Sequence, residues 1–121
     1  MRLPASTVDT LAPYVDRRDL EAMRLTTSPA VTWFPRAFGM SATTFWRFVA
    51  MRADRYDGSP RCLALIAHEA YHITQAREMH YPVFLARYLI GQFQCRFQHD
   101  NHPLEKPAIE LQRRVRAALG G

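Results

Sequence analysis

The chain has 121 residues, of which 48% are hydrophobic and 12% aromatic, a composition typical of one small globular domain rather than of a disordered segment. Its formal net charge is +5, but the basic residues are scattered and the longest basic run is Arg113-Arg114. We therefore expect a solvated basic surface and no nucleic-acid partner. No stretch approaches the roughly 18 apolar residues of a membrane span, and residues 1–6 lack a signal-peptide core. These features predict a cytoplasmic protein without a membrane span.

Residues 1–29 are predicted to be an N-terminal lead-in to a domain that comprises residues 30–121. A short helix is expected from Thr7 to Val15, interrupted by Pro13, and Asp16 is placed to cap a helical turn after it. The apolar residues of the lead-in show no chemistry, so we expect them to pack onto the core of the domain.

From Ala30 to Arg55 the chain becomes rich in β-branched and aromatic residues. Two such runs, residues 31–34 and 43–49, are separated by Pro35 and Gly39. This pattern predicts a small antiparallel hairpin or sheet.

A helix is predicted to follow, and it starts at Ser59-Pro60, which supplies an N-cap and a proline at the first helical position. Good helix formers continue through Ala76, and Tyr81-Pro82 ends the run. The segment is apolar nearly all round, which indicates burial on several sides.

Within this helix lies the sequence His68-Glu69-Ala70-Tyr71-His72. Histidines four residues apart on a helix leave the same face and can bind one metal ion, while Glu69 lies one position round and can act as a base. This is the HExxH pattern of zinc-dependent hydrolases. The alternative is a pair of core histidines bonded to backbone carbonyls, with Glu69 in a salt bridge.

Two more helices are expected downstream. The first runs from Tyr81 to about Phe97, and a polar loop over residues 98–103 follows it. The last runs from Leu104 to Leu119, with Pro107 tolerated in its first turn. Together, these elements predict an α+β fold in which a small hairpin or sheet packs on the HExxH helix beside two further helices.

A catalytic zinc ion needs a third protein ligand. The extended pattern HExxHxxGxxH fails, because Glu78 stands where its third histidine would fall, and His80 lies past the helix end. The remaining candidates lie downstream: His99, His102, Glu105 and Glu110. A carboxylate at the start of the last helix can be aimed rigidly at the histidine pair, which favours Glu105, whereas Glu110 lies on another face and suits a supporting or salt-bridge role.

Residues 65–75, LIAHEAYHITQ, resemble the LLAHELxHVxQ signature of a bacterial minimal metallopeptidase-like family that includes the extracellular contractile injection system core domain. In that family a short hairpin precedes the helix, as Thr43 to Arg52 would here, and an NPxExEA motif follows it. The motif's first glutamate is the expected third zinc ligand, a position that Glu105 takes here. The resemblance covers roughly residues 30–115 and implies a gluzincin-like zinc site; Ala70 and Pro107 depart from the family pattern.

The leading hypothesis is peptide-bond hydrolysis by a Zn²⁺ enzyme. His68, His72 and Glu105 would hold the ion, and Glu69 would be the general base that passes a proton to the leaving amine. Gln75 is a candidate supporting residue. The oxyanion-stabilising donor is left open among five side chains: Tyr71, Tyr81, Tyr88, His99 and His102.

The rival hypothesis keeps the zinc and drops catalysis, so that the metal ties the helices of a small structural or interaction module together. In both cases the expected partner is a peptide or protein, whether as substrate or as binding partner. A strand beside the helix would offer its edge to a peptide substrate in the first case and would only cover the helix in the second.

Overall fold

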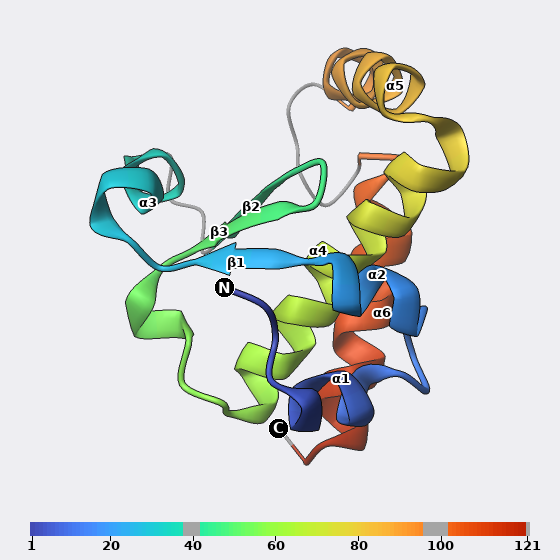
Figure 1. Ribbon diagram of the computed structural model, residues 1–121. Coiled ribbons are helices and arrows are strands. Elements are labelled where there is room, and N and C mark those ends of the chain that lie inside the picture. Colours follow the sequence, from blue (N-terminus) through green and yellow to red (C-terminus); the bar gives the residue numbers. More distant parts are fainter. Residues whose placement is uncertain (38–41, 96–101, 121) are drawn as a thin grey trace.

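The computed structural model describes residues 1–37, 42–95 and 102–120, and it has an α+β fold, as predicted (Figure 1). In chain order the elements are α1 (Ala5–Leu11), α2 (Arg17–Ala22), β1 (Arg24–Thr26), α3 (Pro29–Ala37), β2 (Ala42–Phe45), β3 (Phe48–Met51), the short 3₁₀ turn η1 (Ala53–Arg55), α4 (Pro60–Met79), α5 (Tyr81–Gln94) and α6 (Glu105–Ala118).

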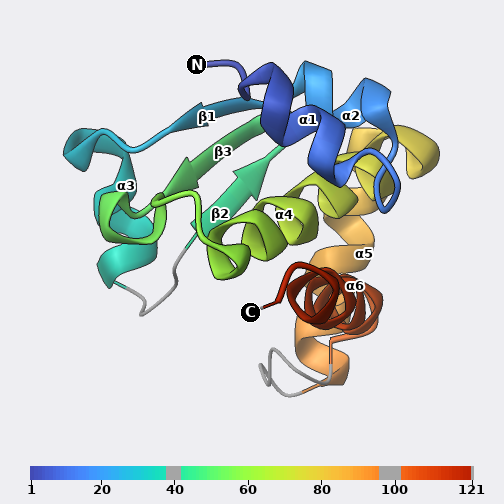
Figure 2. The same ribbon diagram turned by 90° about the horizontal axis from the view of Figure 1, so that it is seen from below.

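The 20-residue helix α4 is the centre of the fold. The Ser59 hydroxyl accepts a hydrogen bond from the Cys62 amide, and Pro60 occupies the first turn, so the predicted start of the helix is confirmed. Helix α4 lies between the sheet and α6 and packs most extensively along α6 (Figure 2). It ends at Met79, because His80 adopts a positive φ of 64°.

The sheet has the strand order β1-β3-β2, with β1 parallel and β2 antiparallel to β3. Side chains alternate between the two faces of each strand. Leu25, Val49 and Met51 are almost completely buried and belong to the core that includes α4. Thr44 pairs with Val49 and therefore lies on this inner face.

The first predicted strand is wrong, because residues 31–34 lie in helix α3. The carbonyl of Ser28 accepts hydrogen bonds from the amides of Val31 and Thr32 and from the Thr32 hydroxyl, which together close the first turn. Pro29 at the start of the helix favours this conformation over the strand that the β-branched residues predict. Gly39, part of the predicted break, lies outside the described residues.

The third strand comes instead from β1, within the predicted lead-in. Asp16 caps α2 by accepting a hydrogen bond from the Arg18 amide, as predicted. Leu11, Leu20 and Met23 are completely buried in the same core as α4. The division of the chain after residue 29 stays a prediction, but the expected packing of the lead-in onto the core is confirmed.

Helix α5 leaves the body of the fold and is joined to it mainly through α4 (Figure 1). Its buried residues are Phe84 and Gly91, whereas Leu89 and Ile90 are more than half exposed. None of the helices within residues 1–37, 42–95 and 102–120 is long and apolar enough to cross a membrane.

Candidate metal centre

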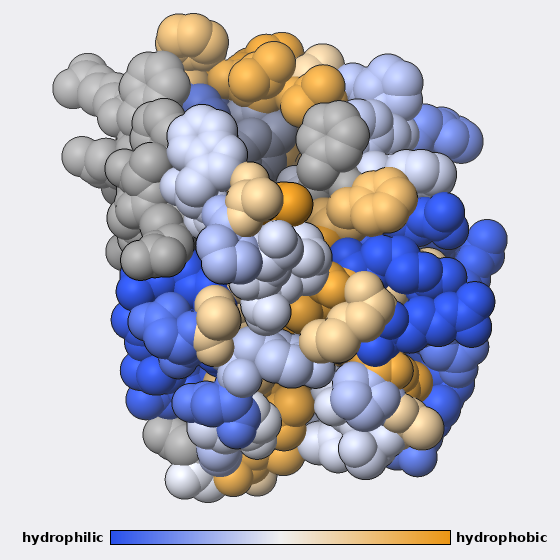
Figure 3. Space-filling model, turned by 60° about the vertical axis from the view of Figure 1, so that its left-hand side comes forward, coloured by the Kyte–Doolittle hydropathy of each residue, from blue (hydrophilic) through white to orange (hydrophobic). Residues whose placement is uncertain are grey.

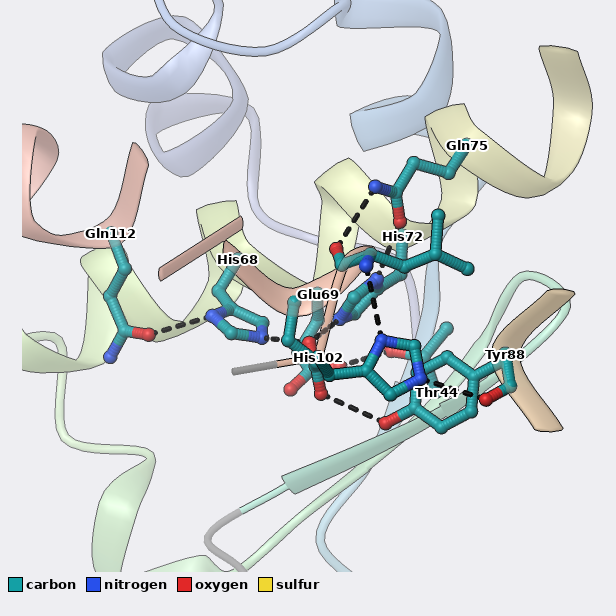
Figure 4. Close-up of polar contacts among 10 residues, drawn as sticks. Thr44, His68, Glu69, His72, Gln75, Tyr88, His102 and Gln112 are labelled. Carbon is teal, nitrogen blue, oxygen red and sulfur yellow. Dashed lines mark hydrogen bonds and ion pairs between the residues drawn. The ribbon is translucent and has the colours of Figure 1, made fainter. Parts of the chain in front are cut away.

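The structure brings together the three predicted metal ligands. His68 and His72 come from one face of α4, and Glu105 is the first residue of α6 (Figure 4). One potential ligand atom from each residue lies within 4.8 Å of the other two. The Glu105 Oε1 atom is 3.1 Å from the His68 Nε2 atom and also contacts the Nε2 atom of His72. All three side chains are buried.

Gln75 sets the orientation of the His72 ring. Its amide nitrogen donates to the Leu104 carbonyl at 3.0 Å, so its amide oxygen faces the His72 Nδ1 atom at 2.8 Å. Because this oxygen can only accept, the His72 Nδ1 atom carries a proton. The Nε2 atom of a neutral His72 therefore presents its lone pair to Glu105 and to any metal ion there.

Gln112 does the same for the other histidine. Its Oε1 atom lies 2.8 Å from the Nδ1 atom of His68. Gln112 follows Glu105 by seven residues, which is close to two helical turns, so both side chains leave α6 toward α4. Each histidine thus has one nitrogen hydrogen-bonded to a glutamine and the other directed at the shared carboxylate (Figure 4).

Glu69 lies beside the cluster and is not one of its three potential ligands. Its side chain is only 5% exposed, and its Oε2 atom accepts a hydrogen bond from the Thr44 hydroxyl. Thr44 belongs to β2, one of the two edge strands of this sheet. The hairpin therefore positions the carboxylate that the sequence predicts to be the general base.

Tyr88 brings α5 to the site. Its hydroxyl donates to the Oε2 atom of Glu105 at 2.9 Å, and its ring lies near the ring of His72. Burial and then the neighbouring Glu105 carboxylate raise the pKa of Tyr88 well above its ordinary value. The phenol therefore remains a hydrogen-bond donor at neutral pH.

His102 holds Tyr88 in place and is not available as a ligand. Its Nε2 atom donates to the Tyr88 carbonyl at 2.8 Å, and its Nδ1 atom accepts from the Leu104 amide at 3.0 Å. The two rings stack with centroids 4.2 Å apart. Gly91 makes room for this imidazole, because a Cβ atom at that position would lie 2.7 Å from the ring.

The charge state of the cluster is set by two opposing influences on His72. Burial lowers the pKa of His72, but hydrogen bonding and attraction to Glu105 outweigh it, and the net direction is upward. A proton on His72 is therefore stabilised by its contact with Glu105. A divalent cation can replace that proton, which is the usual competition at a histidine-carboxylate metal site.

The residues present fit a zinc ion. Zinc binds histidine nitrogen and carboxylate oxygen at about 2.0–2.2 Å, so the ligand atoms of a tetrahedral site lie roughly 3.4 Å apart. The 3.1 Å separation of His68 Nε2 and Glu105 Oε1 is close to that value. A small movement of Glu105 away from His72 would open the space between the three ligand atoms.

Other sequence candidates lie elsewhere or serve other purposes. Glu110 and His80 are exposed, and Tyr71 packs against the hydrophobic core. The ring of Tyr81 lies 6.4 Å from that of Phe84. His99 lies outside the described residues. Gln112 was not predicted to be a site residue. Its spacing of seven residues from Glu105 is the sequence signal that both side chains leave the same face of a helix.

A comparison with protein-family models matches residues 2–80 to the eCIS core domain. No curated protein and no solved structure matches the chain. The matched segment includes β1–β3 and the whole of α4, with His68, Glu69 and His72, and it ends before α5 and α6. Because the match spans more than half of the sequence, the chain belongs to the eCIS core domain family.

Proposed function

We propose that this chain is a zinc-dependent hydrolase that cleaves peptide bonds. The observation that carries the proposal is the pair of glutamine-histidine hydrogen bonds. Gln75 and Gln112 each occupy one histidine nitrogen, so the other nitrogen of both rings points at Glu105. Two histidines that served only to fill the core would have no need of a shared, buried carboxylate.

In this proposal His68, His72 and Glu105 hold the ion. Zinc, when bound, is a Lewis acid that lowers the pKa of a water molecule and polarises a carbonyl group. Glu69 accepts a proton from the attacking water and passes it to the departing amine. The Thr44 hydroxyl holds the Glu69 carboxylate in place during both transfers.

Tyr88 is the proposed donor to the oxyanion that forms from the substrate carbonyl. Its hydroxyl lies 2.9 Å from Glu105, a proposed metal ligand, and would turn from that carboxylate to the oxyanion. Its raised pKa keeps the phenol protonated. A donor aimed at developing charge in a buried site stabilises the transition state.

A second candidate function keeps the metal without catalysis, as a zinc-stabilised interaction module. The observation that favours it is the burial of the ligands, each no more than 5% exposed. A closed site is typical of structural zinc, whereas a catalytic site keeps one position open to substrate. The two functions share the metal and differ in what Glu69 does.

The deciding experiment measures metal content and hydrolysis on the same set of proteins. Zinc content by mass spectrometry is expected to be about one per chain in the wild type and in Glu69→Gln, and near zero in His72→Ala and Glu105→Ala. Glu110→Gln is the matched control, because this glutamate is exposed on the same helix as Glu105.

A quenched-fluorescence peptide library then separates the two functions. Hydrolysis by the zinc-loaded wild type that falls at least a hundredfold in Glu69→Gln supports the peptidase. Hydrolysis that survives unchanged in Glu69→Gln refutes the mechanism. Zinc binding with no cleavage of any library member favours the interaction module. A wild type that binds no zinc refutes both proposed functions.

A further inference from the structure

The outer face of the sheet, turned away from α4, carries a groove of about 840 Å³. Strand pairing aligns Thr26, Ala50 and Thr43 in one row across the three strands. These small side chains leave a hollow that Val31 of α3 and Phe48 of β3 border. Figure 3 views the molecule from the side of α3 and shows apolar side chains between hydrophilic surfaces.

The size and lining of the groove suit a small molecule. Ligand sites usually have volumes of about 300–1,000 Å³ and mostly apolar walls with a few polar groups. The groove falls in this range, and its polar side chains are threonines and arginines. Its volume favours a small, largely apolar ligand over a folded protein partner, which needs a broad and flatter surface.

The charge of the groove is one-sided. Arg24 and Arg47 line it, and none of its described lining residues is acidic. Burial lowers the pKa of Arg24, and the neighbouring positive charges of Arg2 and Arg47 lower it further. An anionic ligand in the groove would reduce the repulsion between these positive charges, so the groove favours an anion.

The two arginines are not equivalent. Arg24 donates to the carbonyls of Glu21, Ala22 and Met23 at the end of α2, so its guanidinium has a structural partner. The Nε atom of Arg47 is buried and has no hydrogen-bond acceptor in the described part of the chain. This atom lies beneath the surface, so a ligand oxygen would meet the rest of the guanidinium group, which lines the groove.

The hairpin turn presents Arg47 rigidly. Its guanidinium carbon lies 4.9 Å from the ring centroid of Trp46 and 5.5 Å from that of Phe48. Trp46 has a positive φ of 58°, which is uncommon for so large a side chain. A backbone conformation of this kind has an energetic cost, and such residues concentrate at functional positions.

We propose that the groove binds a linear aliphatic carboxylate. Its hydrocarbon chain lies along Thr26, Ala50 and Thr43, and its carboxylate accepts a hydrogen bond from Arg47. A neutral lipid would leave the Arg47 donor unsatisfied, and a cationic amphiphile would be repelled by both arginines. Thr44 belongs to both this site and the candidate metal centre, but the proposal needs no metal and holds whether or not the chain is an enzyme.

Isothermal titration calorimetry with dodecanoate tests the proposal, with dodecanol and dodecylammonium as comparison ligands at concentrations below micelle formation. Dodecanoate is expected to bind one site more tightly than dodecanol and far more tightly than dodecylammonium. Arg47→Gln is expected to weaken dodecanoate at least tenfold and to leave dodecanol unchanged. Thr43→Leu fills the groove from the edge strand and is expected to weaken both ligands.

Leu89→Ser is the matched control, because Leu89 is 55% exposed on α5 and does not line the groove. This variant is expected to bind dodecanoate like the wild type. Loss of binding in Leu89→Ser but not in Thr43→Leu, or equal binding of the three ligands by the wild type, overturns the proposal. A peptide with an apolar C-terminal residue that binds more tightly than dodecanoate also overturns it. If Arg47→Gln fails to fold by circular dichroism, the wild-type ligand series and Thr43→Leu decide the outcome.

Discussion

Helix α4 contacts two buried carboxylates that are neutralised in different ways. Asp19, from α2, accepts hydrogen bonds from the Thr74 hydroxyl at 2.5 Å and from the Arg77 Nε atom at 2.8 Å. Glu105, from α6, contacts the two imidazoles of the HExxH motif. Both carboxylates are at most 3% exposed. They differ in the partner that carries the positive charge.

The two clusters differ in whether the carboxylate is already balanced by a permanent charge. Arginine is charged at every physiological pH, so Arg77 neutralises Asp19 without any other species. Histidine is charged only when protonated, so the cluster at Glu105 needs a proton or a cation to balance the carboxylate. The first cluster is therefore complete within the fold, whereas the second is suited to exchanging its positive charge.

The largest expected effect comes from breaking the structural cluster. Asp19→Ala is expected to lower the free energy of unfolding by about 3 kcal/mol, because it leaves Arg77 and Thr74 without their shared acceptor. Urea denaturation measures this loss, and zinc stoichiometry at low urea is expected to stay unchanged. Asp54→Ala is the control, because the ion pair of the exposed Asp54 with Arg52 is expected to contribute little to stability. Loss of zinc from folded Asp19→Ala would show that the two clusters are coupled.

The contribution of Asp19 is also expected to depend on pH. Burial raises the pKa of Asp19, but the hydrogen bonds from Arg77 and Thr74 lower it below the ordinary value of 3.8. A lowered pKa gives stability that is present above 3.8 and is lost as the pH falls through the folded-state pKa. The difference in unfolding free energy between wild type and Asp19→Ala should therefore be constant near neutral pH and shrink below that value. A difference that grows in acid would contradict this assignment.

A smaller effect is expected where α5 meets the second cluster. Gly91→Ala places a Cβ atom 2.7 Å from the His102 ring, which forces the ring or the helix to move at a cost of about 2 kcal/mol. The displaced ring would release Tyr88 from Glu105, so zinc affinity should fall along with the midpoint of unfolding. Gln92→Ala, the next position on α5, controls for a substitution by alanine on this helix and should leave both nearly unchanged. A fully stable Gly91→Ala protein would show that His102 does not fix α5.

Local sequence signals were sufficient to predict the helix that carries the two histidines. Ser59 and Pro60 predict the start of α4, and the HExxH spacing places two imidazoles on one face, because both follow from helix geometry alone. The last helix, predicted over Leu104 to Leu119, is confirmed as α6. The observed hairpin of β2 and β3 matches the one that the family resemblance implies over Thr43 to Arg52, and not the pairing of residues 31–34 with 43–49 that the local pattern predicts. The choice of Glu105 among the ligand candidates agrees with the geometry, and its zinc remains a prediction.

The features that depend on contacts between distant residues could not be predicted from the sequence. Strand β1 pairs with β3 over more than twenty residues, and no local pattern marks such a parallel pairing. Residues 31–34 have strand propensity but lie in α3, where the cap at Ser28 outweighs it. Gln112 has an ordinary helix-surface position in the sequence, and its role becomes visible once α6 lies against α4.

The two glutamines orient the histidines at Glu105, whereas Arg77 neutralises Asp19 without such supporting groups. Gln75→Met removes the acceptor of His72 while keeping the volume of the buried side chain. Zinc affinity is expected to fall about thirtyfold, within the range typical of residues that orient a metal ligand. Competition with a chromophoric chelator measures the change, and the unfolding midpoint of the metal-free protein monitors the lost bond to Leu104. An unchanged affinity would show that the His72 ring is held by packing alone.

Gln112→Met should weaken zinc binding less, by about tenfold. Gln112 is half-buried whereas Gln75 is only 7% exposed, so water can reach the His68 Nδ1 atom and replace the lost acceptor. Glu110→Gln, exposed on the same helix, should leave the affinity unchanged in the same chelator assay. A larger loss in Gln112→Met than in Gln75→Met would reverse this order. It would mean that solvent does not reach His68 and that α6, rather than α4, determines the geometry of the centre.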